Sequence, residues 1–274
     1  MNVEELLALF DWQQRREVEY FGLVREIENG VVCQAPAPGQ KGDGCIIWTD
    51  LSEMDVDEAI RREVAHFQEI GHGFEWKVFA HDAPTDLVQR LAAHGFEVEE
   101  RESVMLLDLE AAPDWLWQPY THDVRRILDP SGVADVMTVQ ERVWNGSFDW
   151  IGESLREELS AVPERISIYC AYADGQPVSS AWVRFHAPGE FASLWGGSTL
   201  GEYRGRGFYT ALLAARAQEA IRRDFRLLTV DAGDQSRPIL AKLGFQVITH
   251  AQACRWHPVP PEAKEGEARS RIPS

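Results

Sequence analysis

A glycine-rich basic turn between two apolar segments has the residue types needed to bind phosphate groups. The run Leu194–Leu200 predicts a buried strand, the turn Arg204–Gly207 reads RGRG, and an apolar 3.6-residue period predicts a helix from Phe208 onward. The first N–H groups of such a helix lack intrahelical partners, and its macrodipole and two arginines add positive charge. Glycine keeps Cβ atoms away from those amides. The turn therefore predicts a site for an anionic, phosphate-containing ligand.

Two common phosphate-binding motifs do not fit this turn. A Walker A loop needs GxxxxGK followed by Ser or Thr, which is absent after Gly201. A dinucleotide fingerprint needs a third glycine where Thr210 stands and an acidic residue about 20 positions further on. The remaining pattern is Arg, two residues, Gly, one residue and a small residue, and in it Thr199–Thr210 resembles the cofactor turn of the GNAT family of acyl-CoA N-acyltransferases. Tyr209 stands where that family has the small residue.

The resemblance extends beyond the turn to most of the C-terminal half. SRPILAKLGF at Ser236–Phe245 is similar to the family's next helix, with Gly244 just after its C-terminus. Read this way, Val124–Trp256 forms one domain, and its expected elements are a helix at Gly132–Val143, a hairpin at Tyr169–Phe185, the cofactor strand and helix, and a strand at Leu227–Asp231. The resemblance implies an α/β fold with a mixed central sheet flanked by helices.

The resemblance also implies acetyl-CoA as acyl donor and direct attack by an amine, without a covalent enzyme intermediate. The strand end Thr199–Gly201 would present backbone groups to the pantetheine arm and the thioester oxygen, so that catalysis is mostly positioning. The cofactor-binding residues carried over from the family are Thr199, Leu200, Gly201, Arg204, Gly205, Arg206, Gly207, Phe208, Tyr209 and Thr210.

The proton donor is a departure from the family pattern. Many members have a tyrosine four residues before the glycine of the LGF motif, and here that position is Leu240. Tyr209 is the candidate to replace it, although an aromatic residue at a helix start is also typical of packing. Water is a further candidate, because a thiolate with a pKa near 8.5 can be protonated by solvent.

Asp231 is the first candidate for the general base. It ends a predicted strand, and open α/β sheets bind ligands at the C-terminal ends of their strands. Capping of the following helix, together with Ser236, is an equally good explanation for it. The other acidic residues near the expected cleft are Glu141, Asp149 and Glu190.

Composition sets the class of protein and its partners. The chain has 274 residues with 45% hydrophobic content, and this length favours two domains. Its net charge of −17 disfavours nucleic acid or an anionic membrane as partner. The acidity favours a cationic substrate, and solubility alone explains it equally well. Arginines nevertheless gather around the cofactor helix, at positions 204, 206, 216, 222, 223 and 226, which suits an anionic ligand there.

Cysteine and histidine spacing predicts neither metal nor disulfides. The cysteines at 33, 45, 170 and 254 form no CxxC pair, and the eight histidines form no HxH or HxxxH pair, so we expect reduced thiols and no metal. The N-terminus has Glu4 and Glu5 in place of a basic leader, and no apolar run reaches ~18 residues. A cytoplasmic protein is therefore expected.

The two halves of the sequence resemble each other. LAAHGF at 91–96 repeats LAKLGF at 240–245, and the first of these lies between predicted strands at 74–80 and 98–109. Upstream of these strands we expect a hairpin from 31–34 and 45–49, followed by a helix at 55–70. The first half has no basic glycine turn between Thr49 and Asp55, so no cofactor is expected there. The predicted division is a degenerate GNAT-like domain at 1–112, a GNAT domain at 113–257 and a Pro-rich charged tail at 258–274.

These features favour an N-acetyltransferase that moves an acetyl group from acetyl-CoA to a primary amine of a small molecule, with the N-terminal half shaping the cleft. Leu240 and the few acidic residues keep open a second interpretation, a catalytically silent CoA-binding sensor or scaffold. A monomer or a homodimer is compatible with either.

Overall fold

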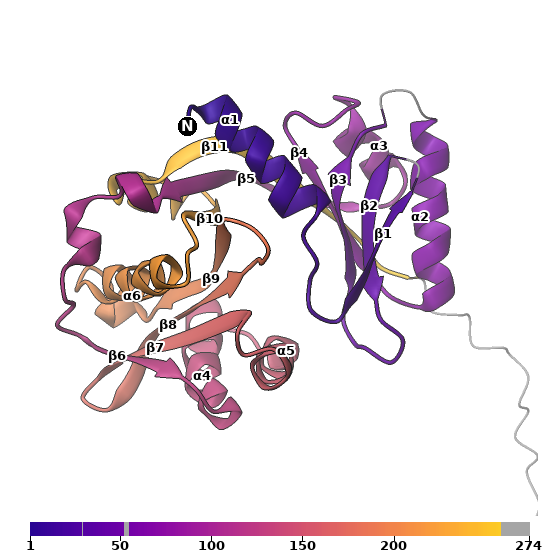
Figure 1. Ribbon diagram of the computed structural model, residues 1–274. Coiled ribbons are helices and arrows are strands. Elements are labelled where there is room, and N and C mark those ends of the chain that lie inside the picture. Colours follow the sequence, from indigo (N-terminus) through magenta and orange to yellow (C-terminus); the bar gives the residue numbers. More distant parts are fainter. Residues whose placement is uncertain (29, 52–54, 259–274) are drawn as a thin grey trace, which may run out of the picture.

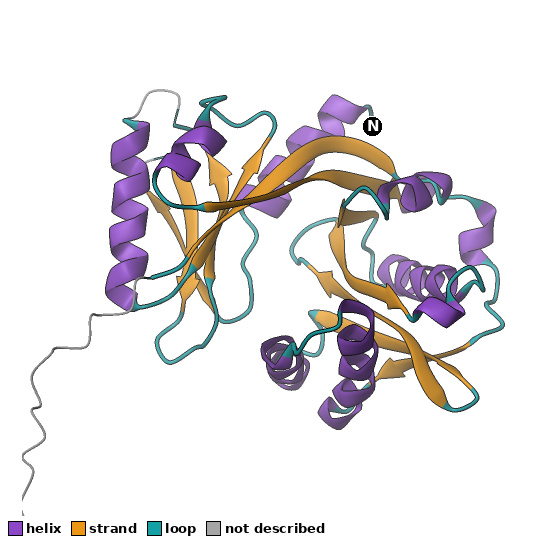
Figure 2. Ribbon diagram, turned by 180° about the vertical axis from the view of Figure 1, so that it is seen from behind, coloured by secondary structure: helices purple, strands orange, loops and turns teal. Residues whose placement is uncertain are grey.

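One continuous mixed β-sheet runs through the whole molecule in the computed structural model, with helices on both of its faces (Figures 1 and 2). The structure describes residues 1–28, 30–51 and 55–258. The eleven strands lie in the order β1-β2-β3-β4-β11-β5-β10-β9-β8-β7-β6. The predicted α/β class with a mixed sheet is confirmed.

The N-terminal half contributes three α-helices and the first five strands. Its elements are α1 Val3–Phe10, β1 Leu23–Glu28, β2 Val31–Pro36, β3 Gly44–Thr49, α2 Val56–Ile70, β4 Phe74–Phe79, α3 Leu87–Ala93 and β5 Glu97–Asp108. A short π-helical stretch, Asp11–Arg16, continues α1. The expected hairpin of β2 and β3 and the helix after Asp55 are present, and Asp55 caps α2 by accepting from the Glu58 N–H at 3.0 Å.

The C-terminal half repeats this order and adds a strand, β6, and a second helix before its first hairpin. Its elements are β6 Asp123–Ile127, α4 Val133–Trp144, α5 Asp149–Ala161, β7 Ile166–Ala173, β8 Gln176–Phe185, β9 Phe191–Thr199, α6 Phe208–Arg222, β10 Leu227–Ala232, α7 Arg237–Lys242 and β11 Gln246–Trp256. The predicted helix, hairpin and strands all occur within a few residues of their expected bounds, and α6 begins at Phe208 as predicted. In both halves a helix joins two parallel strands, α2 between β3 and β4 and α6 between β9 and β10.

The halves exchange one strand each at the centre of the sheet. Strand β11, the last of the chain, lies between β4 and β5 of the N-terminal half, and β5 lies between β11 and β10. Both pairings of β11 are antiparallel, as is the pairing of β5 with β10. The division at 112/113 stays a prediction, but the sheet crosses it. Of the expected tail, only Pro258 lies within the described residues.

A shared core also joins the halves. Leu6 and Phe10 of α1 cluster with Phe79 of β4, Phe191 of β9 and Leu227 of β10. The edge-on contact between the Phe10 and Phe191 rings has a centroid separation of 6.0 Å. This apolar contact fixes the two halves relative to each other.

The cysteines are free thiols, and three of the four are buried. No helix in the described ranges is both long and apolar enough to cross a bilayer. Among the same residues, no group of three His, Cys, Asp or Glu side chains has an arrangement that could hold a metal ion.

Candidate functional site

Strands β9 and β10 separate soon after they begin, which opens the sheet next to the predicted cofactor turn. Their parallel pairing covers only Phe191–Ser193 of β9 against Leu227–Thr229 of β10. Strand β9 then continues to Thr199 and β10 to Ala232. Backbone groups on the facing edges beyond this point are free of each other and available to a ligand lying between the strands.

A bulge bends β9 away from β10. The register with β8 shifts between the pairs Ser180–Ser198 and Trp182–Trp195, which leaves one extra residue in β9. Gly196 lies there at φ +60, and a Cβ on it would overlap the Trp182 ring at 1.8 Å. Only glycine allows both the conformation and this contact.

Gln140 of α4 holds the bulge in place. Its Nε2 donates to the Gly196 carbonyl at 2.7 Å and to Ser180 Oγ at 2.9 Å, and its Oε1 accepts from Ser198 Oγ at 3.1 Å. The Gln140 side chain is buried, so these bonds are shielded from water. The bulge is therefore fixed by a neighbouring helix before any ligand binds.

The turn between β9 and α6 has the open backbone that phosphate binding requires. Gly205 and Gly207 adopt φ +71 and +88, and no atom lies within 4 Å of the Cβ position of Gly201 or Gly205. The first regular bond of α6 runs from the Ala211 N–H to the Gly207 carbonyl at 2.9 Å, so the preceding helix N–H groups point into the turn. These residues fit a pyrophosphate group.

The predicted cofactor residues at either end of this turn differ in the burial and contacts of their side chains. Leu200 and Phe208 are core residues, and Thr199 is buried with its hydroxyl 2.7 Å from Ser179 Oγ. Thr210 is half-buried in the first turn of α6. Leu200 and Phe208 can therefore contribute to ligand binding through their backbone groups, while their side chains anchor the turn.

The two arginines of the turn are exposed, and their guanidinium groups contact different parts of the protein. Arg204 Nε donates to the Thr199 carbonyl at 3.2 Å, which ties the turn to the end of β9. The Arg206 guanidinium lies 5.2 Å from the centre of the Tyr203 ring. Both arginines leave further N–H groups for an anion.

His122, which sequence reasoning missed, braces the turn from the outside. Its Nε2 lies 2.9 Å from the Arg206 carbonyl, and its ring meets the Phe208 ring edge-on at 4.5 Å. A Cβ on Gly207 would be 3.1 Å from His122 Cε1. The segment before β6 therefore fixes the conformation of the turn.

Tyr209 packs against the bulge. A Cβ on Gly197 would lie 2.9 Å from Tyr209 Cε2, so the two residues are in close contact. Burial raises the pKa of the Tyr209 phenol above its usual value of 10.0. Tyr209 thus keeps its proton at neutral pH and lies at the bulge, as a proton donor would have to.

Asp231 lies two residues beyond the last pair of β9 and β10, on the face of the sheet that also carries Thr229. Its carboxylate forms an ion pair with Lys77 Nζ of β4. The capping explanation is wrong for both candidate residues, because no side chain caps α7 at Ser236. Lys77 therefore already engages this carboxylate before any substrate binds.

The other acidic candidates are not part of β10. Glu190 precedes β9, where its backbone carbonyl accepts from the N–H groups of Arg226 and Leu227. Glu141 is on α4, and Asp149 begins α5 with its carboxylate 2.9 Å from Ser147 Oγ.

The strand exchange brings two further carboxylates to Asp231. Glu75 of β4 and Glu102 of β5 surround Lys77 together with Asp231. Burial would lower the pKa of Lys77, but Asp231 and Glu75 outweigh it and raise that pKa, so Lys77 is a fixed cation. Burial raises the pKa of Glu102, Lys77 opposes the rise, and the charges of Asp231 and Glu75 add to it.

A cavity of about 220 Å³ lies beside Trp195 of β9. Tyr20, from the segment before β1, lines it together with Trp195 and Arg184. Burial raises the pKa of the Tyr20 phenol, and the charges of Cys45, Asp231 and Glu75 raise it further. The Arg184 guanidinium is neutralised by Glu158, with Nη2 to Oε2 at 2.8 Å. The cavity is thus lined from both halves of the chain.

His186 borders the same cavity and is neutral. Burial, together with the positive charges of Arg184 and Arg165, lowers its pKa to about 3. Its Nε2 lies 2.7 Å from Ser193 Oγ, which also accepts from Trp195 Nε1 at 2.7 Å. His186 lies in the loop between β8 and β9, and Ser193 and Trp195 both lie on β9, and sequence reasoning missed this group.

The family match agrees with this geometry. Residues 114–245 match the sequence model of the acetyltransferase (GNAT) family, so this part of the chain is a GNAT domain. The family and the fold are those of acyl-CoA-dependent N-acetyltransferases.

Solved structures share the fold over nearly the whole chain. A GCN5-related N-acetyltransferase from Kribbella flavida is 14% identical with a TM-score of 0.66, covering 94% of this chain and 96% of that one. A tandem GNAT protein from the clavulanic acid biosynthesis pathway is 14% identical with a TM-score of 0.58, covering 95% and 96%. A GCN5-related N-acetyltransferase from Sphaerobacter thermophilus is 15% identical with a TM-score of 0.55, covering 93% and 85%. No curated protein matches the sequence.

Proposed function

We propose that this protein transfers an acetyl group from acetyl-CoA to a primary amine of a small, cationic molecule. The observation that carries the proposal is the opening between β9 and β10. The glycine turn follows β9, and Asp231 of the acidic cluster lies on β10 beyond its last pair with β9. The cofactor supplies an activated thioester when bound. The free backbone groups of β9 and of the α6 N-terminus hold it.

The acceptor binds at the junction of the two halves. Asp231, Glu75 and Glu102 face two cations, Lys77 and Arg255, the second of which pairs with Glu75 at 2.8 Å. The cluster therefore retains one negative charge for an ammonium group. Glu102, whose pKa is raised, takes the proton that the amine must lose before it attacks. Tyr209 returns a proton to the leaving thiolate from the other side of the bulge.

The ion pair of Asp231 with Lys77 and the buried Leu240 favour a second candidate, a CoA-binding protein without catalysis. Turnover separates the two. We expect free thiol to be released from acetyl-CoA with one or more members of a panel of primary diamines and amino sugars. Glu102→Gln should lower kcat/KM by about tenfold or more, as expected for a general base, whereas Glu100→Gln, an exposed neighbour on the same strand, should not. Binding of acetyl-CoA without release of thiol from any amine would favour the silent protein.

A further inference from the structure

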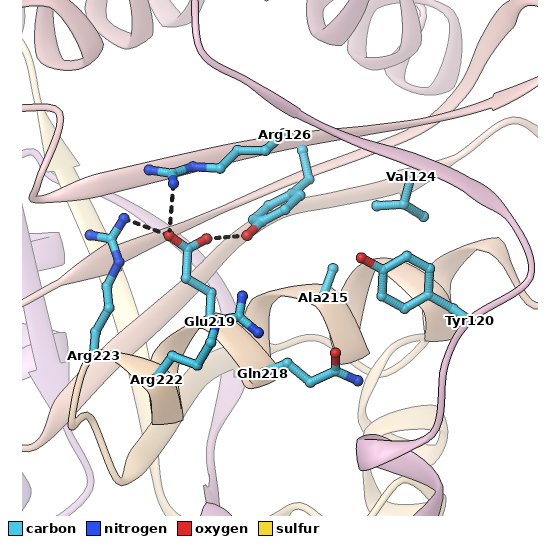
Figure 3. Close-up of a pocket in the computed structure, with 9 residues that line it drawn as sticks. Tyr120, Val124, Arg126, Ala215, Gln218, Glu219, Arg222 and Arg223 are labelled. Carbon is cyan, nitrogen blue, oxygen red and sulfur yellow. Dashed lines mark hydrogen bonds and ion pairs between the residues drawn. The ribbon is translucent and has the colours of Figure 1, made fainter.

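A second and larger cavity, of about 430 Å³, lies beside the C-terminal part of α6 (Figure 3). It opens between α6, strand β6 and the segment that precedes β6. Its volume is within the range of small-molecule sites, ~300–1,000 Å³. The proposed acetyl transfer uses no residue of this cavity.

One end of the cavity is basic. Arg126 of β6 and Arg222 and Arg223 at the end of α6 gather there, as Figure 3 shows. Arg126 and Arg223 both contact the buried carboxylate of Glu219, which also accepts from Tyr169 and from Ser167 Oγ. Glu219 thereby fixes two guanidinium groups in place. Arg223 also donates to the Glu164 carbonyl at 2.8 Å and to Ser167 Oγ at 3.3 Å, so it contributes mainly charge, while Arg126 has further N–H groups to offer.

Arg222 is not neutralised. It is exposed and has no hydrogen-bond or ion-pair partner in the parts of the chain that the structure describes. Three arginines around one carboxylate leave an excess of positive charge, in a protein whose net charge is −17. Such a local reversal of charge favours an anionic ligand.

The other end of the cavity is apolar. Tyr120, Val124 and Ala215 line it, and Figure 3 shows them grouped away from the three arginines. An aromatic ring and two aliphatic groups offer little to a bare phosphate but favour contact with a hydrocarbon or aromatic body.

The cavity is distinct from the phosphate turn. With a rise of ~1.5 Å per residue, Ala215 lies ~10 Å and Arg222 ~20 Å along α6 from Phe208. Tyr120 and Val124 nevertheless flank His122, which contacts the Arg206 carbonyl. A ligand here would therefore lie next to the segment that braces the turn, without entering it.

We infer that this cavity binds a small organic carboxylate, with the carboxylate at Arg126, Arg222 and Arg223 and an apolar body against Tyr120, Val124 and Ala215. Arginine forks pair with carboxylates in two parallel hydrogen bonds, and the fixed positions of Arg126 and Arg223 reduce the entropy lost on binding.

Calorimetric titration of phenylacetate into the full chain tests the site. We expect saturable binding to wild type and to Gly205→Trp, whose change lies in the phosphate turn. Arg222→Gln should weaken binding by about tenfold. Arg61→Gln, which removes an exposed arginine of α2, is the matched control and should bind as wild type does.

Three results would overturn the inference. The first is that wild type does not bind millimolar phenylacetate, and the second is that Arg222→Gln binds it as tightly as wild type. The third is that Gly205→Trp loses binding, which would place the anion at the turn. Inorganic phosphate provides the second comparison. Phosphate binding as tight as that of phenylacetate would show that the apolar end contributes nothing and would contradict the proposed ligand class.

Discussion

The Tyr209 ring lies against Gly197 so closely that a Cβ on Gly197 would be 2.9 Å from Tyr209 Cε2. The family pattern has a small residue at position 209, and here the large residue on α6 meets a glycine on β9. Glycine at position 197 leaves the space that the Tyr209 ring fills, so the helix and the strand can pack closely.

This contact predicts strong coupling between the two residues. Gly197→Ala should destabilise the protein by about 1–3 kcal/mol through overpacking, since Gly197 does not need a positive φ. Tyr209→Ala should relieve most of that cost, so that Gly197→Ala is nearly neutral in the Tyr209→Ala background. Urea unfolding of the four proteins measures the coupling, and additive free energies of unfolding would contradict the contact.

Loss of the Gln140 side chain should lower both the stability of the protein and its affinity for acetyl-CoA. Gln140→Leu leaves the Gly196 carbonyl and two serine hydroxyls without their partner and should cost about 2–3 kcal/mol of stability. It should also weaken acetyl-CoA binding, because the bulge is no longer fixed.

The control for Gln140 is Gln252→Leu, which removes one exposed bond to the Glu99 carbonyl. Calorimetry of acetyl-CoA binding to both variants separates the bulge from a general effect of losing an amide. Equal affinities in the two variants would argue against a role for the bulge in cofactor binding.

The raised pKa of Glu102 predicts that its charge costs stability. A carboxyl whose pKa rises on folding is most favourable when protonated, so wild type loses stability as pH rises through that pKa. Glu102→Gln avoids this loss and should be more stable than wild type at pH 7.5 but not at pH 4. Glu100→Gln should show no such difference between the two pH values, and a gain for Glu102→Gln that is larger at pH 4 would reverse the assignment.

His186 should make the protein sensitive to acid. Its pKa falls from 6.5 to about 3 on folding, so the stability it contributes is present above pH 6.5 and is lost progressively as pH falls toward 3. At pH 5 the loss from this group should reach about 2 kcal/mol. His186→Asn should remove that part of the pH dependence in urea unfolding between pH 7.5 and 5, and an unchanged slope would show that His186 is not the group responsible.

The local elements of the C-terminal half were predictable because their signals are local. The RGRG turn, the helix from Phe208 and the LGF helix end each depend on neighbouring residues, and the structure has all three. The repeat of LAAHGF and LAKLGF likewise corresponds to α3 and α7 in equivalent places of the two halves.

The acceptor side could not be predicted because it depends on pairing between distant strands. Nothing in the sequence indicates that β11 inserts beside β4, and only this exchange brings Lys77 next to Asp231. The alternation in FEWKVF shows that Glu75 and Lys77 share a face of a strand, but not what that face meets. Asp231 was therefore chosen without its partner, and Glu102 was missed.

The central claim is that acetyl-CoA binds at the turn between β9 and α6, and two matched glycines test it directly. Gly205 and Gly71 adopt φ +71 and +74, and neither has an atom within 4 Å of its Cβ position. Tryptophan at either site therefore carries a similar backbone strain, of ~1–2 kcal/mol. In calorimetric titration with acetyl-CoA, we predict micromolar binding to wild type and Gly71→Trp and none to Gly205→Trp. Binding to Gly205→Trp as tight as to wild type, or no binding to wild type, would contradict the account.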